Sequence, residues 1–165
     1  MAGGLRARAR KNIRRIGATA LARVLIALAV VLPRRVALRL FSALGAVAYR
    51  LWRRDRERAL ANLTLAFPAA PRLMIEALAR GSFRALGRNA LDALRLVRQS
   101  PRAVLDSCVI SGELHLEAAY RRGRGVIGLT GHIGCWELMA AFLSAKGYTV
   151  GVIARQIRNE TLGEM

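Results

Sequence analysis

Two short apolar segments, each beside glycine, flank a helical pattern near the end of the chain. Residues 125–130 read Gly-Val-Ile-Gly-Leu-Thr, and residues 148–154 form a second apolar run with β-branched side chains. The residues between them, 133–146, show helical periodicity and end at Gly147. Strand, helix and strand in this order form a βαβ unit, which requires parallel strands and a right-handed crossover. The pattern therefore predicts an α/β fold that contains the start of a parallel sheet.

A long helix is predicted upstream of this unit. Polar residues recur every four positions from Arg72 to Asp92 and again at Arg95 and Gln99. A four-residue spacing drifts around a straight helix of 3.6 residues per turn, so the polar row cannot stay on one face. We therefore expect a bend or break at Gly81 or Gly87.

Shorter elements are predicted between this helix and the βαβ unit. Ser100 followed by Pro101 indicates an N-cap and the first position of a short helix. Residues 108–111 are predicted to form a brief strand, and residues 112–122 a helix that stops at Gly123 in a left-handed conformation.

Positive charge is concentrated at the beginning of the chain. The protein has 165 residues and a net charge of +18, and residues 1–60 contain 15 of the 28 basic side chains but only two of the 10 acidic ones. A chain that is 54% hydrophobic can bury a core, so disorder is excluded. The surplus of arginine indicates an anionic partner for this first third.

The same region is also apolar. Residues 16–32 are interrupted by a single charge, Arg23, and as a helix they would reach about 25 Å, slightly less than a bilayer core. Residues 34–54 combine regularly spaced arginines with apolar side chains, as in a basic helix that lies in a membrane interface. We expect a segment inserted from the cytoplasmic side without full crossing. A solvated charged face and nucleic-acid binding are the alternatives, but few aromatic residues are present to stack on bases.

Few residues in the chain can bind metals. Two cysteines, Cys108 and Cys135, and two histidines, His115 and His132, match neither a disulfide framework nor a zinc site. We expect no structural metal.

The loop that follows the first predicted strand contains the candidate catalytic groups. His132 and Glu137 are five residues apart, about 140° on a regular helix, so they can meet only if His132 lies in the turn before the helix. Gly131 and Gly134 allow such a turn. A carboxylate bonded to one imidazole nitrogen orients the ring and makes the other nitrogen a better base. The alternative is that His132 only makes local hydrogen bonds at the start of the helix, while Glu137 is exposed to solvent.

Residues 125–137, which end in His-Ile-Gly-Cys-Trp-Glu, resemble the bacterial lipid A late acyltransferases, the lauroyl/myristoyl acyltransferases of the wider H-x4-D/E acyltransferase group. Weaker similarity to the family's N-terminal helical region and to its next strand covers residues 61–63, 67–68, 82–83, 87–88 and 151–155. By this resemblance, residues 1–60 form a membrane-anchoring helical segment and residues 61–165 the N-terminal part of an α/β acyltransferase domain.

The resemblance implies an enzyme on the cytoplasmic face of the bacterial inner membrane. It would transfer an acyl chain from acyl carrier protein or acyl-CoA to a hydroxyl of a lipid A-type glycolipid, in contact with anionic membrane lipid and without nucleic acid. His132 would act as general base and Glu137 would orient it, with no metal or bound cofactor. The expected substrate-binding residues are Arg155, Gly131, Gly134 and Trp136.

Two features depart from the family. Cys135 stands where the family usually has asparagine. Because asparagine cannot act as a nucleophile, we expect direct attack of the hydroxyl on the thioester rather than an acyl-cysteine route. Family members are also longer, so the chain is expected to be the N-terminal half of an acyltransferase. A catalytically inactive membrane-binding fragment, and an acyltransferase that acts on another glycolipid or a lysophospholipid, remain as alternatives.

Overall fold

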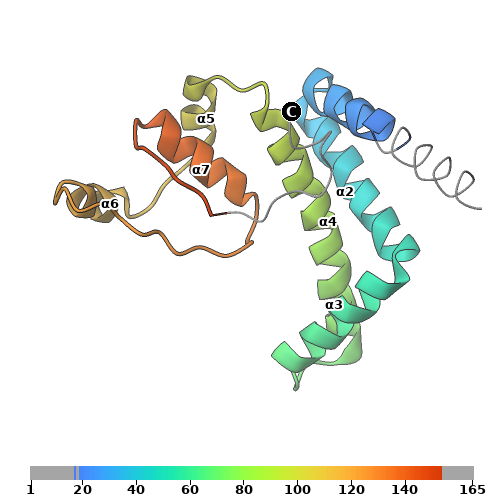
Figure 1. Cartoon of the computed structure of the whole chain (residues 1–165). Coiled ribbons are helices and arrows are strands. Elements are labelled where there is room, and N and C mark those ends of the chain that lie inside the picture. The colour runs from blue at the N-terminus through green and yellow to red at the C-terminus, as the bar shows by residue number, and fades with distance from the viewer. Residues whose placement is uncertain (1–16, 18, 154–165) are drawn as a thin grey trace, which may run out of the picture.

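The structure, a computed structural model, describes residue 17 and residues 19–153 (Figure 1). All regular elements in this part of the chain are helices. Residues 19–31 are helical and lead into α2. The remaining helices are α2 (Arg34–Leu51), α3 (Arg53–Ala66), α4 (Arg72–Leu96), α5 (Pro101–Ser107), α6 (Glu113–Tyr120) and α7 (Trp136–Ala145).

The main core forms where the helix over residues 19–31, α2 and α4 meet. Ala29, Ala37, Phe41 and Leu91 are buried there, and five leucines pack around them. Arg95 of α4 adds polar contacts, since its guanidinium donates to the carbonyl oxygens of Ala29 and Leu32, at 2.7 and 2.6 Å. The Ala29 carbonyl lies in the last turn of the 19–31 helix and the Leu32 carbonyl directly follows that helix, where carbonyl groups lack intrahelical donors. The arginine therefore ties that helix end to α4.

Two glycines allow α2 and α4 to pack closely. A Cβ atom at Gly45 would lie 2.1 Å from the Phe83 carbonyl oxygen, and one at Gly87 would lie 2.0 Å from the Phe41 carbonyl oxygen. Any larger residue would force the helices apart. Both backbones meet at this crossing because neither glycine has a side chain there.

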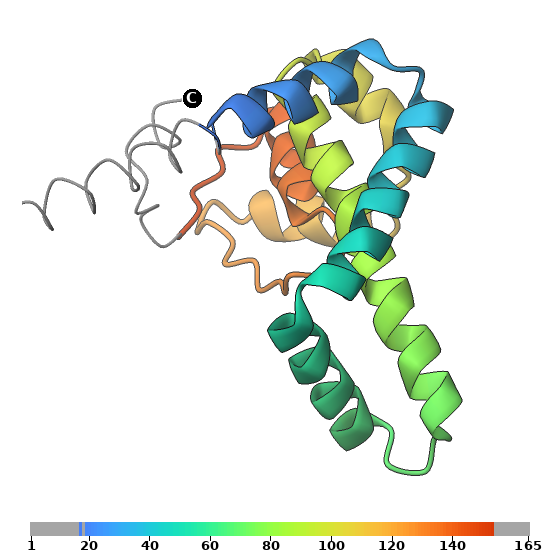
Figure 2. The ribbon, with the colours of Figure 1, turned by 90° about the vertical axis from the view of Figure 1, so that its right-hand side faces the viewer.

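Beyond the crossing, α3 and α4 run side by side as a helical hairpin (Figure 2). Trp52, whose backbone is not helical, separates α2 from α3, and the loop at residues 67–71 connects α3 to α4. Tyr49 packs edge-on against Phe83 at the base of the hairpin, with ring centroids 5.4 Å apart. The guanidinium groups of Arg56 and Arg80 both approach the same tyrosine ring.

The second half of the described chain is a smaller helical group. Helix α7 packs against α5 and also contacts α4. Ser100 caps α5 by accepting from the Ala103 N–H at 3.2 Å, and Pro101 occupies the first helical position, as predicted. Gly123 follows α6 with φ of 69°, which confirms the predicted left-handed stop. Gly147, where the next helix was predicted to end, follows α7 and also has a positive φ, 91°.

The predicted α/β fold with a parallel sheet is wrong. No strand is present within residues 17 and 19–153, and the segments 108–111, 125–130 and 148–153 are irregular. A parallel strand gains stability only from a neighbour that takes its backbone hydrogen bonds and from layers that cover its faces. Ile127 and Leu129 are 99% and 100% exposed, so nothing covers the segment that was expected to be buried. Helix α7 packs on other helices and not on a sheet.

Two of the predicted helices differ in detail from those in the structure. Helix α4 continues without interruption through Gly81 and Gly87, so the predicted break is absent. Its polar row rotates around the helix instead. The basic helix predicted over residues 34–54 exists, but it divides at Trp52 into α2 and the start of α3. None of the described helices is both long and apolar enough to cross a bilayer.

Candidate active site

His132 lies in a tight turn ahead of α7. The Ile133 N–H donates to the Gly131 carbonyl oxygen at 2.8 Å, which closes a three-residue turn with His132 at its centre. The next glycine, Gly134, has φ of 68°, a conformation that favours glycine. Residues 131–134 are exposed, so the imidazole is accessible from solvent. The prediction that His132 precedes the helix is confirmed, although the helix begins at Trp136 rather than at residue 133.

Glu137 lies in the first turn of α7. Cys135 occupies the N-cap position and makes no side-chain capping bond to the backbone. A carboxylate in the first turn interacts favourably with the free N–H groups of a helix N-terminus. Glu137 is half-buried, whereas His132 is exposed.

The imidazole contacts Trp136 and not Glu137. The rings of His132 and Trp136 are 5.2 Å apart at their centroids, with an interplanar angle of 56°. In the described part of the chain, no hydrogen bond or ion pair joins His132 to Glu137. The structure thus brings the predicted base beside a predicted substrate-binding residue and leaves the expected His-Glu pair unbonded.

Glu137 instead interacts with Cys135. The thiol Sγ lies 3.6 Å from the Glu137 Oε2 and donates to it. Burial raises the pKa of the Cys135 thiol, and the charge and hydrogen bond of Glu137 raise that pKa further. The neutral thiol is therefore favoured at this position, which makes it a weak nucleophile.

Of the other predicted substrate-binding residues, Arg155 lies outside the described residues. Gly131 and Gly134 shape the turn around His132, and Trp136 is half-buried at the first position of α7. No group of three or more His, Cys, Asp or Glu residues that could hold a metal ion occurs among the described residues.

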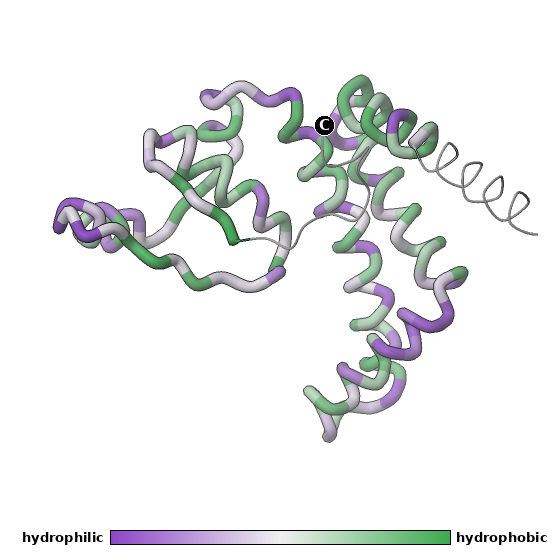
Figure 3. The backbone as a smooth tube through the Cα atoms, in the orientation of Figure 1, coloured by the Kyte–Doolittle hydropathy of each residue, from purple (hydrophilic) through white to green (hydrophobic). Residues whose placement is uncertain are grey.

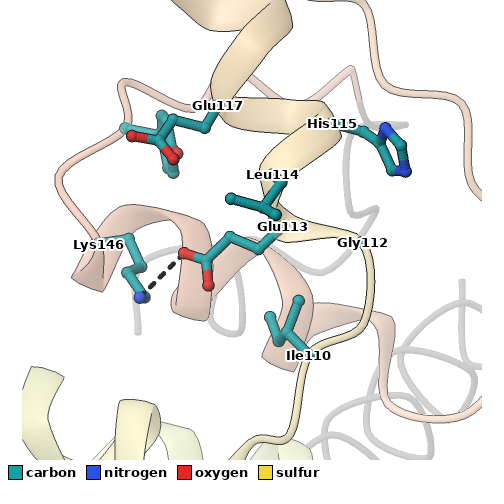
Figure 4. A pocket seen from close by; sticks show the side chains of 8 residues that line it. Ile110, Gly112, Glu113, Leu114, His115, Glu117 and Lys146 are labelled. Atoms are coloured by element: carbon teal, nitrogen blue, oxygen red, sulfur yellow. Dashed lines mark ion pairs between the residues drawn. The ribbon is translucent and has the colours of Figure 1, made fainter.

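A cavity of about 700 Å³ lies between α6 and the C-terminal end of α7 (Figure 4). At its wall the Lys146 ammonium forms an ion pair with Glu113 at 2.9 Å, and this hydrogen bond raises the pKa of Lys146. Tyr148 packs edge-on against Tyr120 nearby. The exposed His115 also lines the cavity, although its ring points away from the ion pair (Figure 4).

Sequence reasoning did not identify this cavity. Its residues come from two regions about thirty positions apart, and none of them forms a motif. His115, the one histidine among these residues, is exposed.

Comparison with known families identifies the class of protein. The family model for bacterial lipid A biosynthesis acyltransferases matches residues 6–165, nearly the whole chain. The chain therefore belongs to the bacterial lipid A biosynthesis acyltransferase family, whose members transfer acyl groups to lipid A-type molecules. No curated protein and no solved structure matches the chain.

Proposed function

We propose that the chain transfers a fatty acyl group from acyl carrier protein or acyl-CoA to a hydroxyl of a lipid A-type glycolipid, with His132 as general base. The observation that carries the proposal is the position of His132, exposed in a three-residue turn immediately before α7, within a chain of this family. An exposed imidazole on a tightly turned loop can approach a lipid hydroxyl without rearrangement of the helices.

In this mechanism the unprotonated imidazole nitrogen of His132 takes the proton of the acceptor hydroxyl. The hydroxyl oxygen attacks the thioester carbonyl carbon, a new C–O ester bond forms, and the C–S bond breaks. The imidazolium then returns the proton to the departing thiolate, so the base is regenerated. Trp136 supports the ring of His132 from one side, and Gly131 and Gly134 hold the loop in its turn.

Glu137 acts as the orienting carboxylate in the proposal. The side chain occupies the first turn of α7, five residues after His132. Catalytic hydrogen bonds are often long or absent before substrate binds and tighten in the complex. Transfer of the Glu137 contact from the Cys135 thiol to the imidazole would supply that bond once the acceptor is in place.

Cys135 is not the acyl carrier in the proposal. Its thiol donates to Glu137, and the pKa of the thiol is raised by burial and by that carboxylate. Direct attack of the lipid hydroxyl on the thioester needs no thiolate. A Cys135→Asn variant should therefore retain turnover.

The protein is proposed to act at the cytoplasmic face of the bacterial inner membrane, in contact with anionic lipid. The strongly basic first third of the chain supports this location, because anionic head groups attract arginine. Both the glycolipid acceptor and its acyl product remain in the membrane, so an enzyme held at the surface meets its substrate there.

The proposal is tested by acyl transfer from a labelled acyl thioester to a lipid A-type glycolipid in detergent micelles. His132→Ala should lower kcat by roughly 100-fold or more, the usual contribution of general base catalysis. Glu137→Gln should lower kcat less. His115→Ala, which removes the exposed histidine of α6, is the matched control and should leave turnover unchanged.

Equal activity of His132→Ala and the wild type would refute the general-base role. A wild-type chain that binds membranes but shows no transfer from either donor would instead support the inactive membrane-binding alternative. Transfer to a lysophospholipid with no transfer to the glycolipid would assign the other acceptor class.

A further inference from the structure

Helix α2 has two apolar faces. Ala37, Phe41 and Gly45 are buried against α4. A second set of apolar side chains, which we call the α2 stripe, remains exposed: Val36 at 48%, Leu44 at 40%, Val47 at 46% and Leu51 at 72%. At 100° per residue, these four positions fall within about 80° of arc and extend about 22 Å along the helix. A helix at the surface of a soluble bundle normally buries its apolar face, so the stripe is left without a partner among the described residues.

A row of arginines follows one side of the α2 stripe. Arg35, Arg39 and Arg50 lie within about 60° of one another on the flank opposite the buried face. All three are exposed and form no ion pair within residues 17 and 19–153. Arg34, by contrast, points toward α4 and pairs with Asp92 at 2.7 Å. Helix α2 contains no acidic residue, so its exposed side combines apolar and uncompensated positive groups.

Trp52 marks the C-terminal end of the stripe. The indole is 55% exposed directly after Leu51 and is followed by Arg53 and Arg54. Tryptophan is enriched where apolar chains meet polar head groups. Figure 3 shows the mostly apolar colours of α2, the helix that descends beside α4; its charged residues lie toward its two ends.

We propose that the exposed side of α2 is the surface with which the protein docks, in the plane of the interface, onto an anionic lipid bilayer. The apolar stripe inserts among the upper acyl chains, and the three arginines reach the lipid phosphates. This inference rests on the membrane association proposed above and specifies the face that performs it.

A second copy of the chain fits the same face less well. A twofold dimer through the stripe would bring two rows of arginine together, with no carboxylate on α2 to compensate them. An anionic bilayer supplies the missing negative charge. Charge complementarity therefore selects lipid over self-association.

Flotation of the purified full chain with vesicles tests the proposal. The chain should bind vesicles of phosphatidylglycerol and phosphatidylethanolamine and bind vesicles of phosphatidylcholine weakly. The triple variant Arg35→Gln/Arg39→Gln/Arg50→Gln should weaken partitioning by roughly 10- to 100-fold. The matched control, Arg98→Gln/Arg102→Gln/Arg124→Gln, removes the same charge from exposed arginines elsewhere and should have a much smaller effect.

A second pair of variants tests the contribution of the apolar α2 stripe to vesicle binding. Leu51→Gln should weaken partitioning about 10-fold, because a leucine no longer leaves water on binding. Leu65→Gln changes a leucine that is 81% exposed on α3 and should leave partitioning unchanged. In a Trp136→Phe background, Trp52 is the only tryptophan, and its emission should shift to the blue on vesicles and be quenched by brominated acyl chains.

Equal losses for the two triple variants would overturn the assignment of α2 while leaving membrane association standing. A wild-type chain that does not float with anionic vesicles would overturn both the association and the face. A dimer in light scattering that Leu51→Gln dissociates would assign the stripe to a second copy. Unchanged thermal unfolding of the variants in circular dichroism excludes misfolding as the cause of any loss.

Discussion

The thiol of Cys135 reports on the charge of Glu137. The two side chains are joined by a hydrogen bond from Sγ to Oε2 at the start of α7. Burial first, and then the Glu137 carboxylate, stabilise the neutral thiol and raise its pKa. The pH dependence of alkylation at this one atom therefore measures whether the carboxylate stays close to it.

In a Cys108→Ser background, alkylation of Cys135 by iodoacetamide should show a midpoint above the ordinary thiol pKa. Glu137→Gln removes the negative charge that opposes thiolate formation, so the midpoint should move to lower pH. Mass spectrometry of the peptide across a pH series gives both midpoints. An unchanged midpoint in Glu137→Gln would show that the carboxylate lies away from the thiol in solution.

Arg95 holds the end of the 19–31 helix through two carbonyl oxygens. Both acceptors are backbone groups, one in the last turn of the helix and one directly after it, and the arginine is half-buried. Arg95→Met keeps much of the apolar stem but leaves these carbonyls without a donor. We expect a loss of about 1–3 kcal/mol in the free energy of unfolding, measured by urea denaturation.

Arg98→Met is the control for the Arg95→Met variant. Arg98 is exposed three residues later, beyond the end of α4, and makes no side-chain ion pair within the described chain. Its replacement should change the free energy of unfolding by less than about 0.5 kcal/mol. Similar losses in both variants would mean that the carbonyl contacts of Arg95 contribute nothing.

At the scale of helices, the close crossing of α2 and α4 depends on two glycines, which have no side chain. The Cβ positions at Gly45 and Gly87 each fall on a carbonyl oxygen of the opposite helix. Those atoms belong to backbone and cannot move without displacing the helix. Glycine is unfavourable inside a helix by about 1 kcal/mol, so its presence here reflects the close approach.

Gly87→Ala and Gly45→Ala should each destabilise the protein by about 2 kcal/mol or more, because the crossing must open. Gly81→Ala is the internal control, since a Cβ there meets nothing within 4 Å. That substitution should stabilise the protein by up to about 1 kcal/mol through helix propensity alone. Thermal unfolding of the three variants checks the order, and a stabilised Gly87→Ala would contradict the observed crossing.

Across the whole molecule, packing is uneven. The 19–31 helix, α2 and α4 share the buried core, whereas every residue from 121 to 134 is exposed. This long connection between α6 and α7 holds His132 and contains three arginines: Arg121, Arg122 and Arg124. A loop with few packed side chains opens at low free-energy cost, which agrees with its role in the proposed function, where a lipid approaches His132.

Within the described residues, trypsin should therefore cut first at Arg122 or Arg124, although α2, α3 and α4 contain more arginines. Backbone within a packed helix must unfold locally before a protease can bind it. Brief digestion at a low enzyme ratio, followed by intact-mass analysis, identifies the order of cleavage. A first cut inside α2 or α4 would show that the core is less stable than the loop.

Features that depend on a few adjacent residues could be predicted from the sequence. The Ser100 cap with Pro101, the left-handed stop at Gly123 and the turn before α7 all occur as expected. The residues 125–137 also led to the correct family. Each of these signals lies within one turn or one short motif, where local chemistry outweighs distant contacts.

Contacts between distant residues could not be predicted in this way. The segment 125–130 has the composition of a strand, but a strand exists only with a neighbour to pair with, and the described chain supplies none. The contact of His132 with Trp136, that of Cys135 with Glu137 and the cavity beside Lys146 likewise depend on how side chains pack. The exposed stripe on α2 emerges only once α4 has covered the other face, because burial belongs to the packed helices and not to the pattern of either helix alone.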